Sequence, residues 1–421
     1  MRVLVVGGGG REHALVWKIS KSPYSENIYC APGNAGISRT AECLDIAAVD
    51  IKGLIHFAER NAIDLTVVGP EQPLVEGIVD QFQKRQLPIF GPCQAAAKIE
   101  GSKAFARELM TKFRIPSPAY RVFTNPNEAA EFVKKKEPPF VLKADGLAEG
   151  KGVLVCPNRT AAFGGIEAIM KKKTFGEAGK KLVIEEYLSG EEVSVLAITD
   201  GEKIVILPSA QDHKPIFEGD TGPNTGGMGA YSPAPLIKPS QMDSIRAEVF
   251  APLIHGMGEM GIPYRGVLYA GLMITPAGPK VLEFNCRFGD PEIQAILPLL
   301  QTDILDLMME SAEGRLKNEQ VQISKQSAVC VVMASGGYPG SYEKGKVIRG
   351  LQSIPHDILV FHAGTKSKDG DLMTAGGRVL GVTALGDTIS QAIESAYRAV
   401  GKITFDGAYF RRDIGHKALV R

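Results

Sequence analysis

The first hundred residues alternate short apolar runs with helical patterns, and this alternation constrains the fold more than any other feature. Residues 2–6 form an apolar run that ends in four glycines, and a helical pattern follows over residues 11–20. The order recurs, with a helical pattern over residues 51–61 and buried strands at 65–68 and 89–90. Short strands that alternate with helices predict a parallel α/β domain, which binds ligands at the carboxyl ends of its strands.

The rest of the chain predicts further domains, because 421 residues exceed what one hydrophobic core usually supports. Strands expected at 140–143 and 153–156 are joined by a glycine-rich turn, which fits a small mobile lid. Residues 211–232 are expected to form a long loop, and loops of that length are usually functional or disordered. In the tail, from about residue 328, we expect a helix that begins near an Asp387 cap.

Composition argues against several classes of protein. A net charge of +1 leaves no electrostatic footprint for nucleic acid or for an anionic membrane surface. The six cysteines are dispersed without a Cys-x-x-Cys pair, which favours neither a zinc site nor a disulfide framework. We expect no signal peptide, and no apolar run approaches about 18 residues. These features predict a soluble cytoplasmic protein with small-molecule ligands.

Residues 282–292, Leu-Glu-Phe-Asn-Cys-Arg-Phe-Gly-Asp-Pro-Glu, carry the clearest chemical pattern. If residues 281–285 form a strand, Glu283 and Asn285 project from the same face. One carboxylate and one amide oxygen suit Mg²⁺, which takes its other ligands from water and nucleotide phosphates. Arg287 then offers a planar fork for a carboxylate or phosphate. The alternative is a solvated strand face, but the charges that follow favour an ATP-dependent enzyme.

Two glycine-rich segments indicate phosphate contacts without matching a standard nucleotide loop. Residues 7–13, Gly-Gly-Gly-Gly-Arg-Glu-His, lack the third glycine of the dinucleotide-binding fingerprint. They leave either an anion site at a helix N-terminus beside Arg11 or a packing turn, and the histidine is expected to pack within the helix. Residues 143–152 lack the spacing and the hydroxyl of a Walker A loop, so they fit a flap over ATP phosphates, with Lys143 on its first strand and Lys151 on its turn.

The expected loop offers partners for both ends of a small zwitterion. Residues 211–214, Gln-Asp-His-Lys, and residues 220–229 contain acidic groups for an amine. The N–H groups of glycines such as Gly226 and Gly227 suit an oxyanion. The alternative is a disordered Gly/Pro insertion.

Together these segments resemble the glycinamide ribonucleotide synthetases, ATP-grasp ligases of purine synthesis also called phosphoribosylamine-glycine ligases, over essentially the whole chain. The resemblance rests on residues 9–14, 31–36, 68–71, 100–103, 143–147, 211–214, 221–231 and 282–292. It implies an α/β multi-domain fold: a Rossmann-like domain over 1–102, an ATP-grasp core over 103–122 and 189–326, its mobile lid over 123–188, and a mixed α/β C-terminal domain over 327–421. The implied reaction joins glycine to 5-phosphoribosylamine with ATP, through a glycyl phosphate. The implied enzyme is a monomer that contacts the upstream amidotransferase transiently.

The resemblance also implies roles for individual residues. Glu283 and Asn285 would hold Mg²⁺ or Mn²⁺, while Arg287, Asp212 and Lys214 would serve glycine or the reacting phosphates. The nucleotide contacts would be Lys103, Lys143, Gly146, Gly150, Lys151, Gly152, Glu185, Glu186, Leu188 and Glu192. The contacts to the other substrates would be Gly9, Gly10, Arg11, Asn34, Glu71, Gly226 and Gly227. Relatives usually carry a small residue where this chain has Glu149, which we expect to point to solvent.

Two rival hypotheses keep the fold. One is another carboxylate-amine ligase, or a bicarbonate- or formate-activating ATP-grasp enzyme, whose relatives lack the loop over 211–231 as written here. The other is a nucleotide-sensing protein without catalysis, against which the intact Glu283, Asn285 and Lys143 argue.

Overall fold

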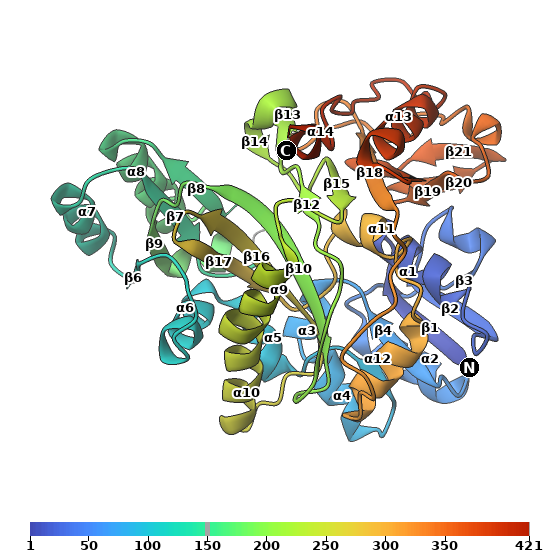
Figure 1. Ribbon diagram of the computed structural model, residues 1–421, viewed down its shortest axis with the longest axis horizontal. Coiled ribbons are helices and arrows are strands. Elements are labelled where there is room, and N and C mark those ends of the chain that lie inside the picture. Colours follow the sequence, from blue (N-terminus) through green and yellow to red (C-terminus); the bar gives the residue numbers. More distant parts are fainter. Residues whose placement is uncertain (148–151, 421) are drawn as a thin grey trace.

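A parallel five-stranded sheet forms the N-terminal part of the molecule (Figure 1). The computed structural model describes residues 1–147 and 152–420. The N-terminal elements are β1 (Arg2–Gly7), α1 (Gly10–Ile19), β2 (Asn27–Pro32), β3 (Glu42–Cys43), α2 (Ile51–Arg60), β4 (Leu65–Val68), α3 (Glu71–Val75), α4 (Ile78–Lys84), β5 (Ile89–Phe90) and α5 (Gln94–Gly101). The strand order is β3-β2-β1-β4-β5, with every neighbouring pair parallel. The predicted parallel α/β domain is therefore confirmed.

An antiparallel four-stranded sheet with two helices forms a lid at one end of the molecule (Figure 1). Its elements are β6 (Tyr120–Phe123), α7 (Pro126–Lys135), β7 (Phe140–Ala144), β8 (Val153–Cys156), α8 (Arg159–Ile166) and β9 (Leu182–Glu186). The strand order is β6-β9-β7-β8, and the two predicted strands are β7 and β8. Buried side chains between residues 123 and 184 form a hydrophobic cluster of their own, so the lid folds around a separate core.

A second antiparallel sheet, of order β11-β10-β16-β17, continues from the lid. The elements of this part are α6 (Lys103–Lys112), β10 (Glu191–Thr199), β11 (Ile204–Ile206), α9 (Pro239–Ile245), α10 (Ala251–Glu259), β16 (Gly266–Thr275), β17 (Gly278–Asn285), α11 (Glu292–Ile296) and α12 (Ile304–Glu313). Short 3-10 turns lie at Ile37–Arg39, Gly176–Lys180, Glu218–Asp220 and Leu351–Ser353, and π-helical turns at Glu167–Lys171 and Arg246–Phe250.

The C-terminal sheet has the order β12-β15-β18-β22-β19 and takes two strands from the middle of the chain. Its elements and their neighbours are β12 (Gln211–Asp212), β13 (Pro215–Phe217), β14 (Thr221–Asn224), β15 (Gly229–Ser232), β18 (Ser327–Ala334), β19 (Leu359–His362), β20 (Thr365–Lys368), β21 (Asp371–Thr374), β22 (Arg378–Gly386), α13 (Ile389–Val400) and α14 (His416–Leu419). The prediction of one long loop over 211–232 is therefore wrong. Four short strands lie within it, because β15 pairs with β18 nearly a hundred residues later.

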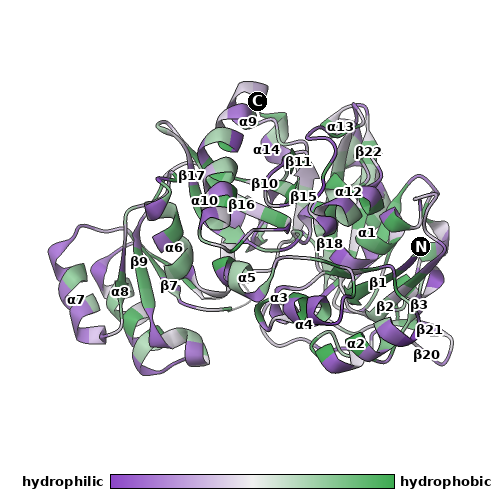
Figure 2. Ribbon diagram, turned by 90° about the horizontal axis from the view of Figure 1, so that it is seen from below, coloured by the Kyte–Doolittle hydropathy of each residue, from purple (hydrophilic) through white to green (hydrophobic). Residues whose placement is uncertain are grey.

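The helix expected in the tail is α13, but its cap is Thr388 and not Asp387. The Thr388 hydroxyl accepts from the Gln391 N–H at 3.3 Å, and the Gln391 side chain accepts from the Thr388 N–H at 3.2 Å. This reciprocal pair is a capping box, which satisfies two N–H groups at the helix start. In Figure 2, α7 at the outer end of the lid is largely hydrophilic, whereas α1 is largely hydrophobic. None of the helices in the described chain has the length and hydropathy that crossing a membrane requires.

Candidate active site

One cavity of about 440 Å³ collects side chains from every part of the molecule. It lies where the N-terminal sheet, the lid, the second antiparallel sheet and the C-terminal sheet meet. The charged and amide side chains that line it are Arg11, Glu71, Glu100, Lys103, Arg107, Lys143, Glu185, Asp212, Lys214, Glu283, Asn285, Arg287, Asp290, Glu292 and Arg378. A cavity with so many ionisable groups suits a highly charged ligand better than an apolar one.

Glu283 and Asn285 have the chemistry of a magnesium site. Both line the cavity from β17, and within the described chain neither side chain has a hydrogen-bond partner. Burial raises the pKa of the Glu283 carboxyl, but Lys214, Lys143 and Lys103 outweigh it, so the net pKa is lowered. The described residues contain no group of three or more His, Cys, Asp or Glu that could cage a metal. A carboxylate and an amide oxygen fit Mg²⁺, which completes its shell with phosphates and water.

A β-bulge in β17 positions the cations around this pair. Leu282 is the extra residue opposite β16, and its carbonyl accepts from Lys143 Nζ and from Arg107 Nη2, both at 2.8 Å. A bulge leaves such a carbonyl outside the strand ladder. Glu185 holds the same two cations, with its Oε1 2.7 Å from Arg107 Nε and its Oε2 3.0 Å from Lys143 Nζ. The lysine therefore enters the cavity in one fixed orientation.

Lys103 approaches the cavity from the N-terminus of α6. Its Nζ donates to the Gly146 carbonyl at 2.9 Å, which ties the helix to the turn after β7. Asp145 accepts from the Ser102 hydroxyl at 2.9 Å and from the Ala104 N–H at 3.0 Å. Burial lowers the pKa of Lys103. The cavity is also lined by Gly146 and Gly152. The predicted contacts Gly150 and Lys151, and the preceding Glu149, lie outside the described residues.

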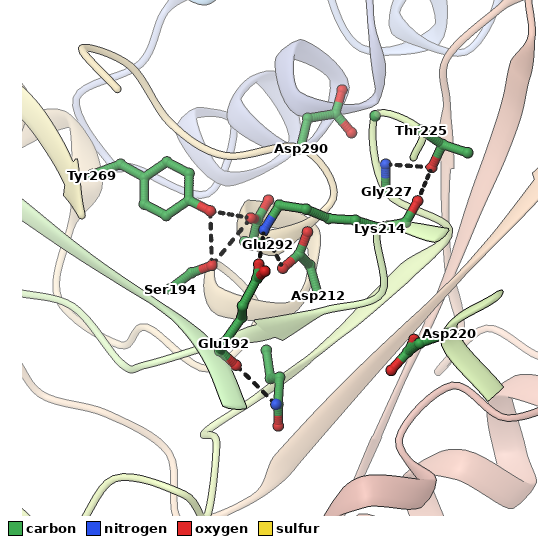
Figure 3. A network of polar contacts seen from close by, with 12 residues as sticks. Glu192, Ser194, Asp212, Lys214, Asp220, Thr225, Gly227, Tyr269, Asp290 and Glu292 are labelled. Carbon is green, nitrogen blue, oxygen red and sulfur yellow. Dashed lines mark hydrogen bonds and ion pairs between the residues drawn. The ribbon is translucent and has the colours of Figure 1, made fainter. Parts of the chain in front are cut away.

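Lys214 lies among carboxylates, as Figure 3 shows. Its Nζ is 2.8 Å from Glu192 Oε2 and 3.3 Å from Asp212 Oδ1. Burial lowers the pKa of Lys214, but the carboxylates of Asp212 and Glu192 raise it by more. The net pKa is therefore raised and the amine is charged. Burial raises the pKa of Asp212 to about 7, although Lys214 opposes this. Glu292 adds a third carboxylate at this end of the cavity, so negative charge exceeds the single ammonium.

Glu292 is fixed by two hydroxyl groups. Its Oε1 accepts from Tyr269 Oη at 2.8 Å and from Ser194 Oγ at 3.3 Å (Figure 3). The two hydroxyls also bond each other at 2.8 Å. Buried polar groups that are all paired in this way hold one arrangement.

Two arginines that are each paired with carboxylates lie at the opposite end, where Arg11 Nε is 2.7 Å from Glu12 Oε1. Arg287 Nε is 3.1 Å from Glu71 Oε2, and Arg287 Nη2 is 3.1 Å from Glu100 Oε1. Both Arg11 and Arg287 donate through Nη1 to the Phe288 carbonyl, at 3.3 and 3.2 Å. Two guanidinium groups that share one acceptor are suited to bind an anion between them.

Several predicted contacts do not line this cavity: Gly9, Gly10, Asn34, Glu186, Leu188, Glu192 and Gly227. Asn34 is the clearest case, because its Nδ2 donates to the carbonyls of Gly8 and His362, at 2.9 and 2.8 Å. Its Oδ1 accepts from the N–H groups of Gly36 and Ile37, at 2.9 and 3.0 Å. These four bonds use every hydrogen-bonding position of the amide. The Asn34 side chain is therefore fully bonded within the protein, and its contact with a substrate stays a prediction.

A side chain at Gly9 or Gly10 of the N-terminal turn would meet the end of a neighbouring side chain, and the predicted substrate contacts of both glycines stay predictions. A Cβ on Gly10 would lie 2.7 Å from the Gln294 side chain, and one on Gly9 would lie 2.9 Å from Glu12. Gly227 has φ of +108°, and a Cβ there would lie 2.4 Å from Pro291, so only glycine fits without strain.

The sequence patterns missed the cavity residues Arg107, Glu100, Tyr269, Tyr338 and Arg378. Arg378 Nη1 donates to the carbonyls of Gly226 and Asp290, at 2.6 and 2.7 Å, and the Gly226 N–H donates to Tyr338 Oη at 3.0 Å. The C-terminal part thus holds the glycine loop in place. No local pattern marks these residues, because their partners are distant in sequence.

Two antiparallel sheets beside a charged cavity that holds Lys103, Lys143, Glu283 and Asn285 have the architecture of an ATP-grasp enzyme. Models of the phosphoribosylglycinamide synthetase family match at residues 1–100 (N domain), 101–293 (ATP-grasp domain) and 328–417 (C domain). The chain belongs to this family.

Relatives of known name cover the chain from end to end. A phosphoribosylamine-glycine ligase of Caldanaerobacter subterraneus subsp. tengcongensis is 51% identical, over 98% of this chain and 99% of its own length. One of Vibrio parahaemolyticus is 48% identical, over 100% and 99%. The crystal structure of a phosphoribosylamine-glycine ligase from Thermotoga maritima superposes with a TM-score of 0.85 at 36% identity, over 98% of this chain and 100% of that one. Biotin carboxylase from Campylobacter jejuni shares the fold alone, with a TM-score of 0.77 at 14% identity.

Proposed function

We propose that this protein joins glycine to 5-phosphoribosylamine with cleavage of ATP to ADP and phosphate, through a glycyl phosphate. The single observation that supports the proposal is one cavity lined by Glu283 and Asn285, by the lysines Lys103, Lys143 and Lys214, and by the arginines Arg11 and Arg287. Membership of the family agrees with this reaction. A bicarbonate-activating enzyme is not favoured, because the biotin carboxylases resemble the chain at only 14–17% identity.

Glu283 and Asn285 would hold Mg²⁺, whose charge would neutralise the phosphates of bound ATP. We propose that Lys143 and Lys103 bind the phosphates from the lid side, with Lys214 on the opposite side. The glycine carboxylate attacks the γ-phosphorus and ADP leaves. The amine of phosphoribosylamine then attacks the acyl carbon and phosphate leaves with loss of an amine proton. No enzyme nucleophile is needed, since positioning and charge stabilisation suffice for phosphoryl transfer.

The two ends of the cavity suit the two ends of glycine. We propose that Asp212, with Glu292 beside it, binds the ammonium group, because negative charge is in excess there. The pair of Arg11 and Arg287 suits a carboxylate or the phosphate of phosphoribosylamine. Gly226 also lines this cavity.

The adenine contacts differ from the simplest expectation. The Glu185 carboxylate is engaged by Arg107 and Lys143, so we propose that it orients them and does not touch the nucleotide. The Glu186 N–H donates to the Ala119 carbonyl at 2.9 Å. The Leu188 backbone, beyond the end of β9, is then the candidate for the adenine edge. Use of Mn²⁺, a monomeric state, a cytoplasmic location and contact with the amidotransferase stay predictions.

The decisive experiment measures ADP release from purified protein with ATP, Mg²⁺ and glycine. Phosphoribosylamine is generated in the assay from ammonia and ribose 5-phosphate, and is omitted from the control. Full turnover that requires both co-substrates would establish the ligase. ADP release that follows bicarbonate, or no release at all, would overturn the substrate assignment and leave the fold.

A further inference from the structure

A second cavity, of about 280 Å³, lies between the N-terminal and C-terminal parts and shares no lining residue with the catalytic cavity. His13 and Arg39 line it from the N-terminal side, and His362 from the end of β19. His13 belongs to the glycine-rich motif that begins the chain, yet the proposed reaction gives it no role. Arg11, two residues earlier, faces the catalytic cavity.

The two histidines present ring nitrogens to this cavity in a fixed arrangement. The His362 backbone N–H donates to His13 Nδ1 at 2.7 Å, so His13 Nδ1 is the acceptor and Nε2 carries the proton. His362 is 2% exposed, and its Nδ1 bonds Thr365 Oγ1 at 3.1 Å. The two ring centroids are 5.5 Å apart. Within residues 1–147 and 152–420, neither His13 Nε2 nor His362 Nε2 has a hydrogen-bond partner.

The charge of this cavity is positive and uncompensated. The Arg39 guanidinium has no ion pair or hydrogen bond with any described residue, and no described acidic residue lines the cavity. Burial, and then the charge of Arg39, lower the pKa of His13 to about 4. Burial is also the main cause that lowers the pKa of His362 to about 3, with smaller contributions from His13 and Arg39. At neutral pH the site therefore offers one cation and neutral imidazole nitrogens.

Besides Gly36, Thr40 and His356, five apolar side chains line this cavity: Leu351, Ile354, Pro355, Ile358 and Val360. A free inorganic ion would leave this surface in contact with water, whereas an apolar substituent on the anion would cover it.

We propose that this inter-domain cavity binds a small organic monophosphate. Its phosphate would lie between Arg39 and the His13 Nε2–H, and its apolar part against Leu351 and Ile354. Arg39 supplies a planar fork, which bonds phosphate oxygens in pairs. A volume near 280 Å³ accepts a ligand of about the size of an aryl phosphate.

One side chain joins this cavity to the N-terminal glycine turn. The Asn34 amide donates to the carbonyls of both Gly8 and His362.

The test uses phenyl phosphate as the probe, because it carries one phosphate and one compact apolar ring. Binding is measured by isothermal titration calorimetry on the full chain with Mg²⁺ and saturating ADP present, which fills the proposed nucleotide site of the catalytic cavity. Inorganic phosphate is titrated in parallel. We expect phenyl phosphate to bind more tightly than inorganic phosphate, with a Kd of about 1 mM or below.

The matched variants are Arg39→Gln and Arg60→Gln. Both arginines are exposed on the N-terminal part, but Arg60 does not line the cavity. Arg39→Gln should weaken phenyl phosphate binding at least about tenfold, as loss of a charge-assisted bond does, and Arg60→Gln should not change it. Nitrogen-15 histidine spectra should show the His13 ring shifting on titration. No binding up to about 10 mM, or equal binding by both variants, would overturn the proposal.

Discussion

Arg107 and Glu185 form a buried bidentate ion pair, with Nε to Oε1 and Nη2 to Oε2 both at 2.7 Å. Both side chains are 2% exposed. The same carboxylate lies 3.0 Å from Lys143 Nζ, and Arg107 also donates to the carbonyls of Val281 and Leu282. One carboxylate in the lid thus connects α6, β7 and β17, the strand of Glu283 and Asn285. The geometry of the nucleotide site depends on it.

Glu185→Gln should therefore damage both stability and ATP binding. Removing the charge leaves Arg107 buried without its anion, which costs about 3–5 kcal/mol in comparable buried pairs. We expect a large rise in the Michaelis constant for ATP as Lys143 loses its support. Glu186→Gln is the control, since that carboxylate is 44% exposed and its pair with Lys280 lies at the surface. Urea unfolding and ATP titration measure both effects, and equal behaviour of the two variants would contradict the assignment.

Glu283→Gln should lower the affinity for Mg²⁺. No hydrogen bond within the described chain depends on this carboxylate, although Lys214, Lys143 and Lys103 lower its pKa and so favour its ionised form. We expect the Mg²⁺ concentration for half-maximal ADP release to rise about 10–100-fold, as when a metal site is impaired. Lys280→Ala, on the same strand, should leave that concentration unchanged. Chelation by EDTA should abolish turnover in the wild type. A variant that keeps the wild-type Mg²⁺ dependence would remove Glu283 from the metal site.

Asp212 should give the reaction a pH dependence near neutrality. Burial raises its pKa to about 7, whereas an unfolded Asp titrates near about 3.9. The folded state therefore favours the protonated form, so its contribution to stability is present at low pH and is lost as pH rises through about 7. Binding of a glycine ammonium needs the ionised form. We expect kcat/KM for glycine to rise with pH through this range, and Asp212→Asn to remove the rise. An unchanged profile in the variant would assign the titration elsewhere.

Arg411 does not line the cavity, and we expect it to act as a positioning residue for the hairpin next to Lys214. Its side chain is fully buried and donates from Nη1 to the Pro215 carbonyl at 3.0 Å and to Asp220 at 2.9 Å, which clamps the β13–β14 hairpin next to Lys214. Arg411→Ala should destabilise the protein by roughly 2–4 kcal/mol, less than a fully enclosed pair because Asp220 is 32% exposed.

Arg411→Ala should also lower the activity of the protein that remains folded. We expect kcat to fall at temperatures where the variant is fully folded, with partial recovery in Arg411→Lys. Arg412→Ala is the matched control, because Arg412 is the next residue in the chain and its side chain is exposed. A variant with lowered thermal stability but normal kcat would reduce Arg411 to a structural role.

The sequence determined the parallel α/β domain, the lid strands β7 and β8 and the Glu283/Asn285 pair, because each is encoded by short-range periodicity. A strand brings residues two apart to one face wherever it lies in the molecule. The roles of Lys103, Lys143 and Lys214 were inferred from the family resemblance of the segments that contain them.

Only the tertiary structure decided which of these side chains are available to a ligand. Distant partners, Arg107 and His362, engage the polar atoms of Glu185 and Asn34, whose contacts with ligands stay predictions. Arg378 entered the cavity through a sheet in which β15 pairs with β18 across nearly a hundred residues. Strands of two to four residues carry too little periodicity to be read locally, and they form because long-range pairing satisfies their backbone groups.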